Sequence, residues 1–269
     1  MKNKLRIKFY CRSFNKELYL LSRHLYEDAG YPCVRLTDQT ADGYFFKMLE
    51  DETCDIAINV DEDCFISDLD AVLALAQKMS DEGWVNMGCS DAGRGVPRSG
   101  DAEVTNPFFN LFNLHEIRKS WNAYRLIPEL KKDSYKGLEP YYNFFHWMVR
   151  TFPGRTLYLD NRRHSDGIST LLFDAEGHHL CSHTWFARQF RPSWLSHLFE
   201  GNDLKGVNHT ERIERLIQEV YAERGRSVLV LSPWQQLQCS LDEMIRWSIK
   251  VPQRLYHWPQ KMSHRASGK

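Results

Sequence analysis

An alternation of strand-like and helix-like segments over residues 5–89 constrains the fold of this chain more than any other feature. Residues 5–10 alternate apolar and basic side chains, which is the two-residue period of a strand, and residues 15–29 then carry apolar side chains at helical spacing. Further strands are predicted at 32–36, 54–60 and 84–89, and further helices at 41–49 and 68–79. Elements in this order predict an α/β fold in which helices flank a mostly parallel central sheet.

The rest of the chain is less regular. Residues 90–106 hold glycine, proline and charged residues with little periodicity, which indicates a functional loop. Downstream, the predicted helices cover 117–131, 141–151 and 209–224, and the predicted strands cover 156–159 and 169–173. We expect two parts, an α/β domain over residues 1–200 and a helical C-terminal extension over residues 201–269.

The composition is that of an ordinary folded protein. Of 269 residues, 42% are hydrophobic and 26% are charged, which excludes a disordered chain and a small disulfide scaffold. The seven cysteines are scattered and form no C-x-x-C pair, as expected for reduced thiols. No apolar run reaches the length of a signal peptide or of a membrane-spanning helix. These features predict a cytoplasmic protein.

An acidic triplet, Asp61-Glu62-Asp63, directly follows the apolar strand predicted at 54–60. Ligands of open parallel sheets bind at the carboxyl ends of the strands, and residues two apart on an extended segment point the same way. The carboxylates of Asp61 and Asp63 would therefore converge and repel unless a cation lies between them. Mg²⁺ or Mn²⁺ binds such carboxylates together with phosphate oxygens, which a nucleotide diphosphate would supply. The alternative is a solvated acidic turn.

Four segments in a fixed order resemble a known class of enzymes. They are the segments 59–65 (NVDEDCF), 91–95 (DAGRG), 106–113 (NPFFNLFN) and 183–188 (HTWFAR). This combination resembles bacterial, D-x-D-containing glycosyltransferases of the GT-A class, over about the first two thirds of the chain. The resemblance implies a Rossmann-like GT-A fold, with residues 1–200 as the nucleotide-sugar-binding and catalytic domain.

The resemblance also implies a metal site. Asp63 would be the firmest ligand, Asp61 would contact the metal or the ribose, and His183 would be a third ligand. Three other histidines compete with His183 for this role, namely His164, His178 and His179. The cofactor would be Mn²⁺ or Mg²⁺.

Further residues are candidates for binding the nucleotide sugar. Arg12 follows the first strand and has the forked guanidinium that suits phosphate, although it is also a plausible surface charge. Asp38 follows the second predicted strand, where an acid would meet the base or the ribose, or would simply be a turn residue. Asn106 begins the aromatic and amide-rich segment 106–113, whose side chains suit a sugar or, alternatively, a buried core.

An inverting transferase needs a general base near the sugar carbon. Three acids are candidates for this base: Asp91 in the loop after a predicted strand, Glu139, and Asp166 in a polar turn. A retaining enzyme would need no such base, and the sequence does not choose between the two outcomes.

The C-terminal segment differs from the body in charge. The net charge of the chain is zero, yet after Glu243 there is no acid, and six lysines and arginines alternate with aromatic and aliphatic residues. Such a tail suits an anionic membrane surface and hence a lipid-linked acceptor. It suits a nucleic-acid acceptor less specifically, and a tail that folds back on the acidic body is the plain alternative.

Together these features predict a metal-dependent glycosyltransferase, of the hexosyltransferase class. It would move a sugar from a nucleotide-diphosphate sugar to a hydroxyl of a glycan or lipid-linked acceptor, in the cytoplasm or at the periphery of the inner membrane. One alternative is a catalytically inactive protein of the same fold that binds a carbohydrate or a partner. Another is a nucleotidyltransferase, although the segment 9–15 after the first strand lacks the glycine usual in that class.

Overall fold

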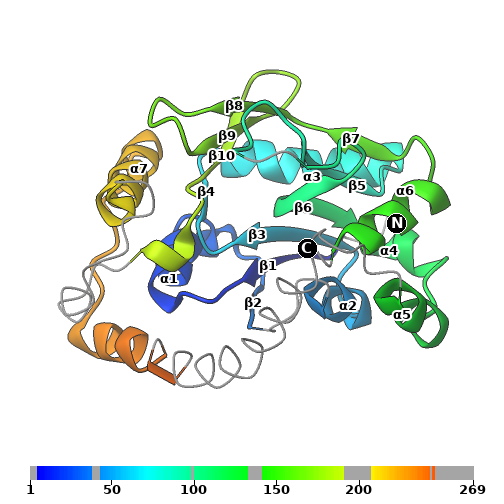
Figure 1. The fold of residues 1–269 in the computed structure, drawn as a ribbon, viewed down its shortest axis with the longest axis horizontal. Coiled ribbons are helices and arrows are strands. Elements are labelled where there is room, and N and C mark those ends of the chain that lie inside the picture. Colours follow the sequence, from blue (N-terminus) through cyan, green and yellow to red (C-terminus); the bar gives the residue numbers. More distant parts are fainter. Residues whose placement is uncertain are drawn as a thin grey trace, which may run out of the picture.

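The predicted α/β class is confirmed in the computed structural model, which describes residues 5–37, 43–97, 100–132, 141–190, 207–242 and 244–245. A six-stranded sheet forms the centre, and a smaller four-stranded sheet lies beside it (Figure 1). Helices cover both faces of the central sheet. Within the described residues, no helix is long and apolar enough to cross a membrane.

The central sheet has the strand order β2-β1-β3-β6-β5-β7. Its strands are β1 (Ile7–Arg12), β2 (Cys33–Leu36), β3 (Ile56–Asp61), β5 (Asn86–Ser90), β6 (Thr105–Asn113) and β7 (Thr156–Tyr158). Strands β1, β2 and β3 run parallel, as do β5 and β7, while β6 runs antiparallel to both of its neighbours. The sheet is therefore mixed, and most of its pairings are parallel as predicted.

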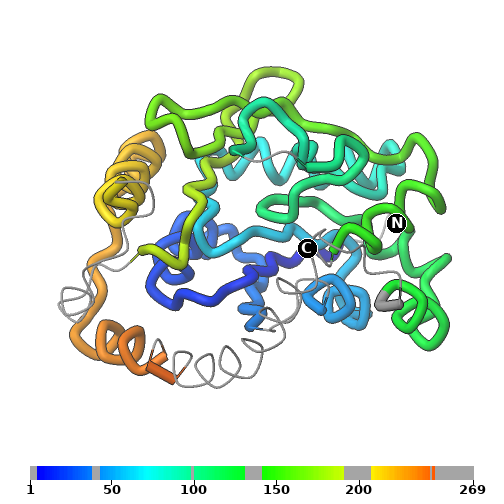
Figure 2. The backbone as a smooth tube through the Cα atoms, viewed as in Figure 1, coloured from blue at the N-terminus to red at the C-terminus, as the bar shows by residue number. Residues whose placement is uncertain are grey.

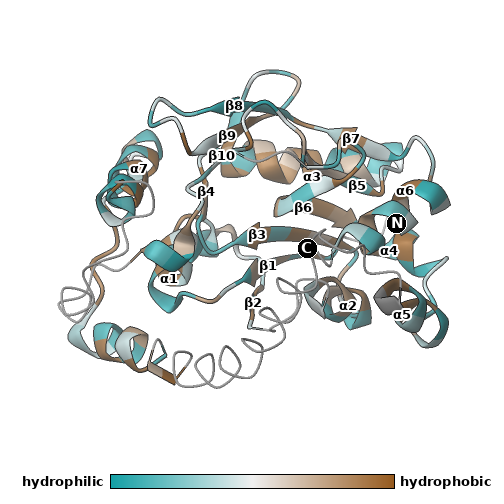
Figure 3. Ribbon diagram, viewed as in Figure 1, coloured by the Kyte–Doolittle hydropathy of each residue, from teal (hydrophilic) through white to brown (hydrophobic). Residues whose placement is uncertain are grey.

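The helices bury two separate apolar clusters against the sheet. The helices are α1 (Lys16–His24), α2 (Gly43–Glu50), α3 (Leu69–Glu82), α4 (Leu114–Arg118), α5 (Ala123–Lys132), α6 (Tyr142–Thr151) and α7 (His209–Glu223), with short 3-10 turns η1 (Glu27–Ala29) and η2 (Ala187–Gln189). Ile58 packs with α1, α3 and α7, while its neighbour Ala57 packs with α2 and α6 on the opposite face. Figure 3 shows the resulting brown interior, with polar outer surfaces on helices such as α7.

The second sheet holds β4 (Cys64–Ile66), β10 (His179–His183), β9 (Thr170–Phe173) and β8 (Asp160–Arg163), all antiparallel in that order. Strand β4 starts after a two-residue turn from β3, so the chain passes from one sheet to the other through Glu62 and Asp63. The register pairs Cys64 with His183. This pairing brings a late segment of the chain beside the acidic triplet.

Two segments differ from the prediction. The helix expected over 117–131 is divided into α4 and α5, which are separated by residues 119–122. Residues 105–113, for which the sequence predicted no strand, form the long strand β6, which is irregular because Gly88 pairs with Asn110 but Ser90 pairs with Thr105. Pro107 lies within this irregularity, where its missing N–H leaves no gap in a regular ladder.

The C-terminal part begins within the same core. Ile213 and Ile217 of α7 lie in the cluster that also buries Phe9 of β1. Residues 233–242 form a further helix. The expected boundary at residue 200 falls outside the described residues, and the division into two parts remains a prediction.

Candidate metal centre at the carboxyl end of the central sheet

One edge of the central sheet collects several of the predicted site residues. Strands β1, β3 and β5 end at this edge, and the antiparallel β6 begins there. The register places Arg12 of β1 beside Asp61 of β3, and Ser90, which precedes Asp91, beside Thr105, which precedes Asn106. The topology thus brings Arg12, Asp61, Asp91 and Asn106 to one edge of the sheet.

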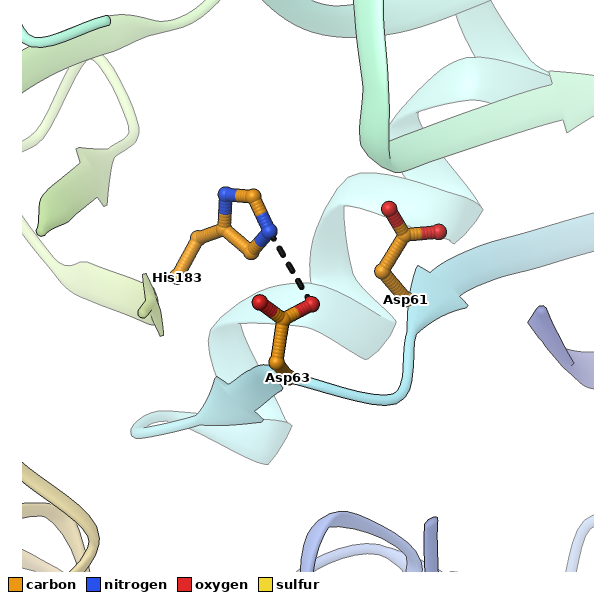
Figure 4. Close-up of side chains that lie close together, drawn as sticks. All are labelled: Asp61, Asp63 and His183. Atoms are coloured by element: carbon orange, nitrogen blue, oxygen red, sulfur yellow. Dashed lines mark hydrogen bonds and ion pairs between the residues drawn. The ribbon is translucent and has the colours of Figure 1, made fainter. Parts of the chain in front are cut away.

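Asp61, Asp63 and His183 converge at this edge (Figure 4). Asp61 is the last residue of β3, Asp63 lies in the turn to β4, and His183 is the last residue of β10. One ligand atom from each of the three lies within 4.8 Å of the other two. His183 Nε2 and Asp63 Oδ1 are 3.1 Å apart. Two ligands at right angles on an octahedral ion with bonds near 2.1 Å would be separated by about 3 Å, so this spacing fits a shared cation.

Asp63 is buried and held as a carboxylate. Its Oδ2 accepts a hydrogen bond of 3.1 Å from the Thr184 hydroxyl, and its backbone carbonyl accepts one of 2.9 Å from the Thr184 N–H. Burial alone would raise the pKa of Asp63, but the charge and hydrogen bond of His183 and the hydrogen bond of Thr184 outweigh burial and lower that pKa. A buried anion is therefore available to a cation at neutral pH.

His183 is fixed by aromatic neighbours. Its ring stacks on Phe108, with centroids 4.4 Å apart and planes at 9°, and it also contacts Trp185 at 4.4 Å. The irregular start of β6 at Pro107 carries Phe108 to this position. The Nδ1 atom of His183 is buried and has no hydrogen-bond partner among the described residues. The ring is thus held mainly by packing, with Nε2 directed at the two carboxylates.

Arg12 pairs with Asp61. Its Nε and Nη2 donate to the two carboxylate oxygens at 2.7 and 3.0 Å, and its guanidinium lies over the rings of Tyr44 and Phe45. Burial lowers the pKa of Arg12, but the adjacent Asp61 more than offsets this and leaves the pKa raised. Arg12 Nη1 is buried and unpaired among the described residues. The sequence predicted Arg12 as a phosphate ligand, and in the structure its first partner is the carboxylate of Asp61.

Glu62, the middle acid of the triplet, was not singled out by the sequence. Its side chain is buried and accepts a hydrogen bond from the backbone N–H of Phe14, in the segment between β1 and α1. Burial, followed by the nearby charge of Asp63, raises the pKa of Glu62 to about 8. Glu62 thereby connects the β3–β4 turn to the start of α1, while the acids on either side of it face the cluster.

Asp91 and Asn106, predicted for two different roles, contact each other. Asn106 Nδ2 donates to one oxygen of the fully buried Asp91, and the Tyr142 hydroxyl of α6 donates to the other. Asn106 Oδ1 accepts from the backbone N–H of Phe108. A Cβ atom at Gly100 would collide with the Asp91 carboxylate, so the glycine allows the loop to cover it closely. The roles of Asp91 and Asn106 remain predictions.

Asp166 lies in a different network, in the turn between β8 and β9. It accepts hydrogen bonds from Ser169 and from the N–H of Ile168, and it forms a 3.1 Å ion pair with Arg212 of α7. Burial opposes ionisation, but these partners lower the pKa of Asp166 to about 2. Two other candidates, Asp38 and Glu139, fall outside the described residues.

Arg212 also supports the segment that follows His183. Its Nη2 donates to the carbonyl of Trp185 at 3.0 Å. Trp185 and Phe186 have positive φ angles of 58° and 61°, a backbone region that costs energy for residues other than glycine. The Trp185 indole N–H donates to Thr170 Oγ1 at 2.8 Å. These contacts, which sequence patterns do not reveal, fix the turn behind the histidine.

The competing histidines have other partners. His164 Nε2 lies 3.0 Å from Glu219, and the ring of His178 lies 2.7 Å from Asp174. His179 lies 3.0 Å from Glu223 of α7. Within the described residues, His183 is the histidine that joins two carboxylates in a potential metal-binding group.

Comparisons with known proteins give distant likenesses of fold. No protein-family profile and no curated protein matches the chain. A glycosyltransferase involved in the glycosylation of the major capsid of PBCV-1 matches with a TM-score of 0.40 and 12% identity, over 57% of this chain and 82% of its own. The glycosyltransferase GlyE of Streptococcus pneumoniae matches with a TM-score of 0.34 and 14% identity, over 58% of this chain and 39% of its own. A cytidylyltransferase from Leptospira borgpetersenii matches with a TM-score of 0.35 and 11% identity, over 84% of this chain and 100% of its own. What the site does has to follow from the residues of this chain.

Proposed function

We propose that this protein is a metal-dependent glycosyltransferase that moves a sugar from a nucleotide-diphosphate sugar to an acceptor hydroxyl. The observation that carries the proposal is the convergence of Asp61, Asp63 and His183 at the carboxyl edge of the central sheet. Such edges are where α/β sheets bind ligands. Two carboxylates and one imidazole form a donor set for Mn²⁺ or Mg²⁺ that leaves further coordination positions for phosphate oxygens.

Each residue near the cluster has a distinct task in this proposal. Asp63 and His183 bind the ion, and a bound ion would offset the negative charge that develops on the departing diphosphate. Arg12 orients Asp61 through its two hydrogen bonds. Its Nη1, which has no hydrogen-bond partner among the described residues, is a donor for a phosphate oxygen. Thr184 holds Asp63 in place from the other side.

Among the candidate bases, the placement favours Asp91. Asp91 follows β5 at the same sheet edge as the cluster, whereas the carboxylate of Asp166 is occupied by its ion pair with Arg212. Asn106 and Tyr142 orient the Asp91 carboxylate. Because Asp91 is fully buried, its action on an acceptor requires Gly100, which lies against the carboxylate, to move aside.

A thermal-shift screen tests the proposal. UDP-, GDP-, CMP- and dTDP-sugars are each added with and without Mn²⁺, and a bound donor raises the melting temperature by mass action. We expect one donor to stabilise the protein only with the ion, and Asp63→Asn to remove this effect. The matched control, Asp160→Asn on the exposed edge of β8, should retain it. A metal-independent shift, or an unchanged shift in Asp63→Asn, contradicts the proposal.

The products of turnover separate the related alternatives. A glycosyltransferase releases the nucleoside diphosphate from a UDP-, GDP- or dTDP-sugar, or CMP from a CMP-sugar. A nucleotidyltransferase would instead release pyrophosphate from a nucleoside triphosphate and a sugar phosphate. Metal-dependent donor binding without either product would point to an inactive binding protein.

A further inference from the structure

The helix at residues 233–242 is attached to the body by polar side chains. It follows α7 and lies beside α1 and β2, as the orange part of the chain in Figures 1 and 2 shows. Gln238 accepts a 3.1 Å hydrogen bond from Lys16 Nζ, and Asp242 forms a 3.2 Å ion pair with Arg35. These two residues are four apart, so one polar stripe of the helix faces the protein.

A different stripe of the same helix is apolar and exposed. Trp234, Leu237, Leu241 and Met244 recur every three or four residues, and their exposed fractions are 64%, 49%, 47% and 61%. A surface helix of a folded domain normally buries its apolar stripe and exposes its polar one. This helix does the reverse: its polar stripe contacts the body of the protein, which indicates that its apolar stripe binds something else.

The sequence that follows identifies the chemistry of that partner. After Glu243 the chain contains six lysines and arginines and no acid. These residues are Arg246, Lys250, Arg254, Lys261, Arg265 and Lys269. A surface that carries negative charges beside an apolar layer matches this combination of basic and apolar side chains.

We propose that the stripe formed by Trp234, Leu237, Leu241 and Met244 docks on an anionic phospholipid surface. The stripe would enter the boundary between headgroups and acyl chains, and the basic residues after Glu243 would pair with lipid phosphates. Within the described residues the helix is too short and too polar to span a bilayer, so we expect it to lie in the plane of the interface. This surface is separate from the metal centre, so the proposal stands without the transferase activity.

Sedimentation with vesicles tests this docking surface. The full-length protein is mixed with vesicles of phosphatidylcholine alone or of phosphatidylcholine and phosphatidylglycerol in equal parts. We expect binding to the anionic vesicles only, and Leu237→Gln/Leu241→Gln should weaken it about tenfold or more, because two exposed leucines no longer leave water. Glutamine preserves helix propensity. Tyr124→Gln, at a residue of α5 that is 96% exposed, is the matched control and should bind like the parent.

Three outcomes would overturn the proposal. The first is that the parent protein fails to bind anionic vesicles, and the second is that the double variant binds them as well as the parent does. The third is that the parent is a dimer and the double variant a monomer, which would assign the stripe to a second copy of the chain. The test is independent of the proposed transferase. Asp63→Asn should bind vesicles normally, while the double variant should keep the melting shift with donor and Mn²⁺.

Discussion

Two groups of ionisable residues, one around Asp166 and one at the candidate metal centre, differ in how their charges are balanced. Asp166 has a permanent cation, Arg212, as well as a hydroxyl and backbone N–H groups, so its charge is satisfied within the protein. At the sheet edge, Arg12 donates two hydrogen bonds to Asp61. Among the described residues, no arginine or lysine is recorded as paired with Asp63. The carboxylate of Asp63 relies on a histidine and a threonine. The first group needs no ligand to be stable, whereas the second has a place for another cation.

The largest expected effect concerns the group around Asp166 and Arg212. Arg212→Met should destabilise the protein by about 2–3 kcal/mol, because the half-buried Asp166 loses its cation, and Ser169 and the Trp185 carbonyl each lose a donor. Urea unfolding measures this change. Arg215→Met, at an exposed position of the same helix, is the control and should change stability by less than about 0.5 kcal/mol. Equal effects of the two variants would show that the Asp166 pair is no more than a surface pair.

The second prediction compares one histidine from each group. His183→Gln should weaken Mn²⁺ binding by about tenfold or more, since it removes a ligand. His164→Gln, which alters only contacts with Asp166 and Glu219, should leave Mn²⁺ affinity unchanged. Titration of Mn²⁺ followed by electron paramagnetic resonance gives both affinities. Equal affinities in the two variants would remove His183 from the metal site.

The third prediction concerns the pH dependence of the stability that Asp166 contributes. The pKa of Asp166 is lowered to about 2, below its ordinary value of 3.8. A lowered pKa contributes stability that is present above the unfolded pKa and is lost as pH falls towards the folded pKa. Between pH 4 and pH 2 the parent should lose about 1 kcal/mol from this residue, after allowance for solvent screening. Asp166→Asn should lack this part of the loss when unfolding is measured across that range.

The smallest expected effect concerns the support behind His183. Trp185→Phe keeps the ring contact but removes the indole donor to Thr170, at a cost of about 0.5–1.5 kcal/mol. Mn²⁺ affinity should fall only a few-fold, because Nε2 of His183 is still directed at Asp63. A loss as large as that of His183→Gln would mean that the turn, rather than the histidine, determines binding.

Most of the fold follows from local patterns. The strands and helices of the first part were predictable because buried strands and one-sided helices have different periods. Strand β6 of the central sheet and three strands of the small sheet, β4, β8 and β10, were not predicted. Residues 160–163 read Asp-Asn-Arg-Arg and have no apolar alternation, and β4 is only three residues long. Their pairing depends on distant partners, which a single sequence does not reveal.

The site was predictable where it depends on strand ends and not where it depends on register. The Asp61-Glu62-Asp63 triplet was predicted from its position after an apolar strand, whereas His183 was chosen through the resemblance to glycosyltransferases. The contact between Arg12 and Asp61 requires β1 and β3 to align residue for residue, which the sequence does not specify. The stacking of Phe108 on His183 likewise arises from the irregular pairing of β6.

The acidic turn lies at the seam between the two sheets. Asp61 is the last residue of β3 in the central sheet. Asp63 directly precedes β4 of the small sheet, and His183 is the last residue of β10 in the same sheet. An ion bound by all three would cross-link the sheets at the point where the chain passes between them. Occupancy would then alter the mechanical coupling of the two sheets at this turn.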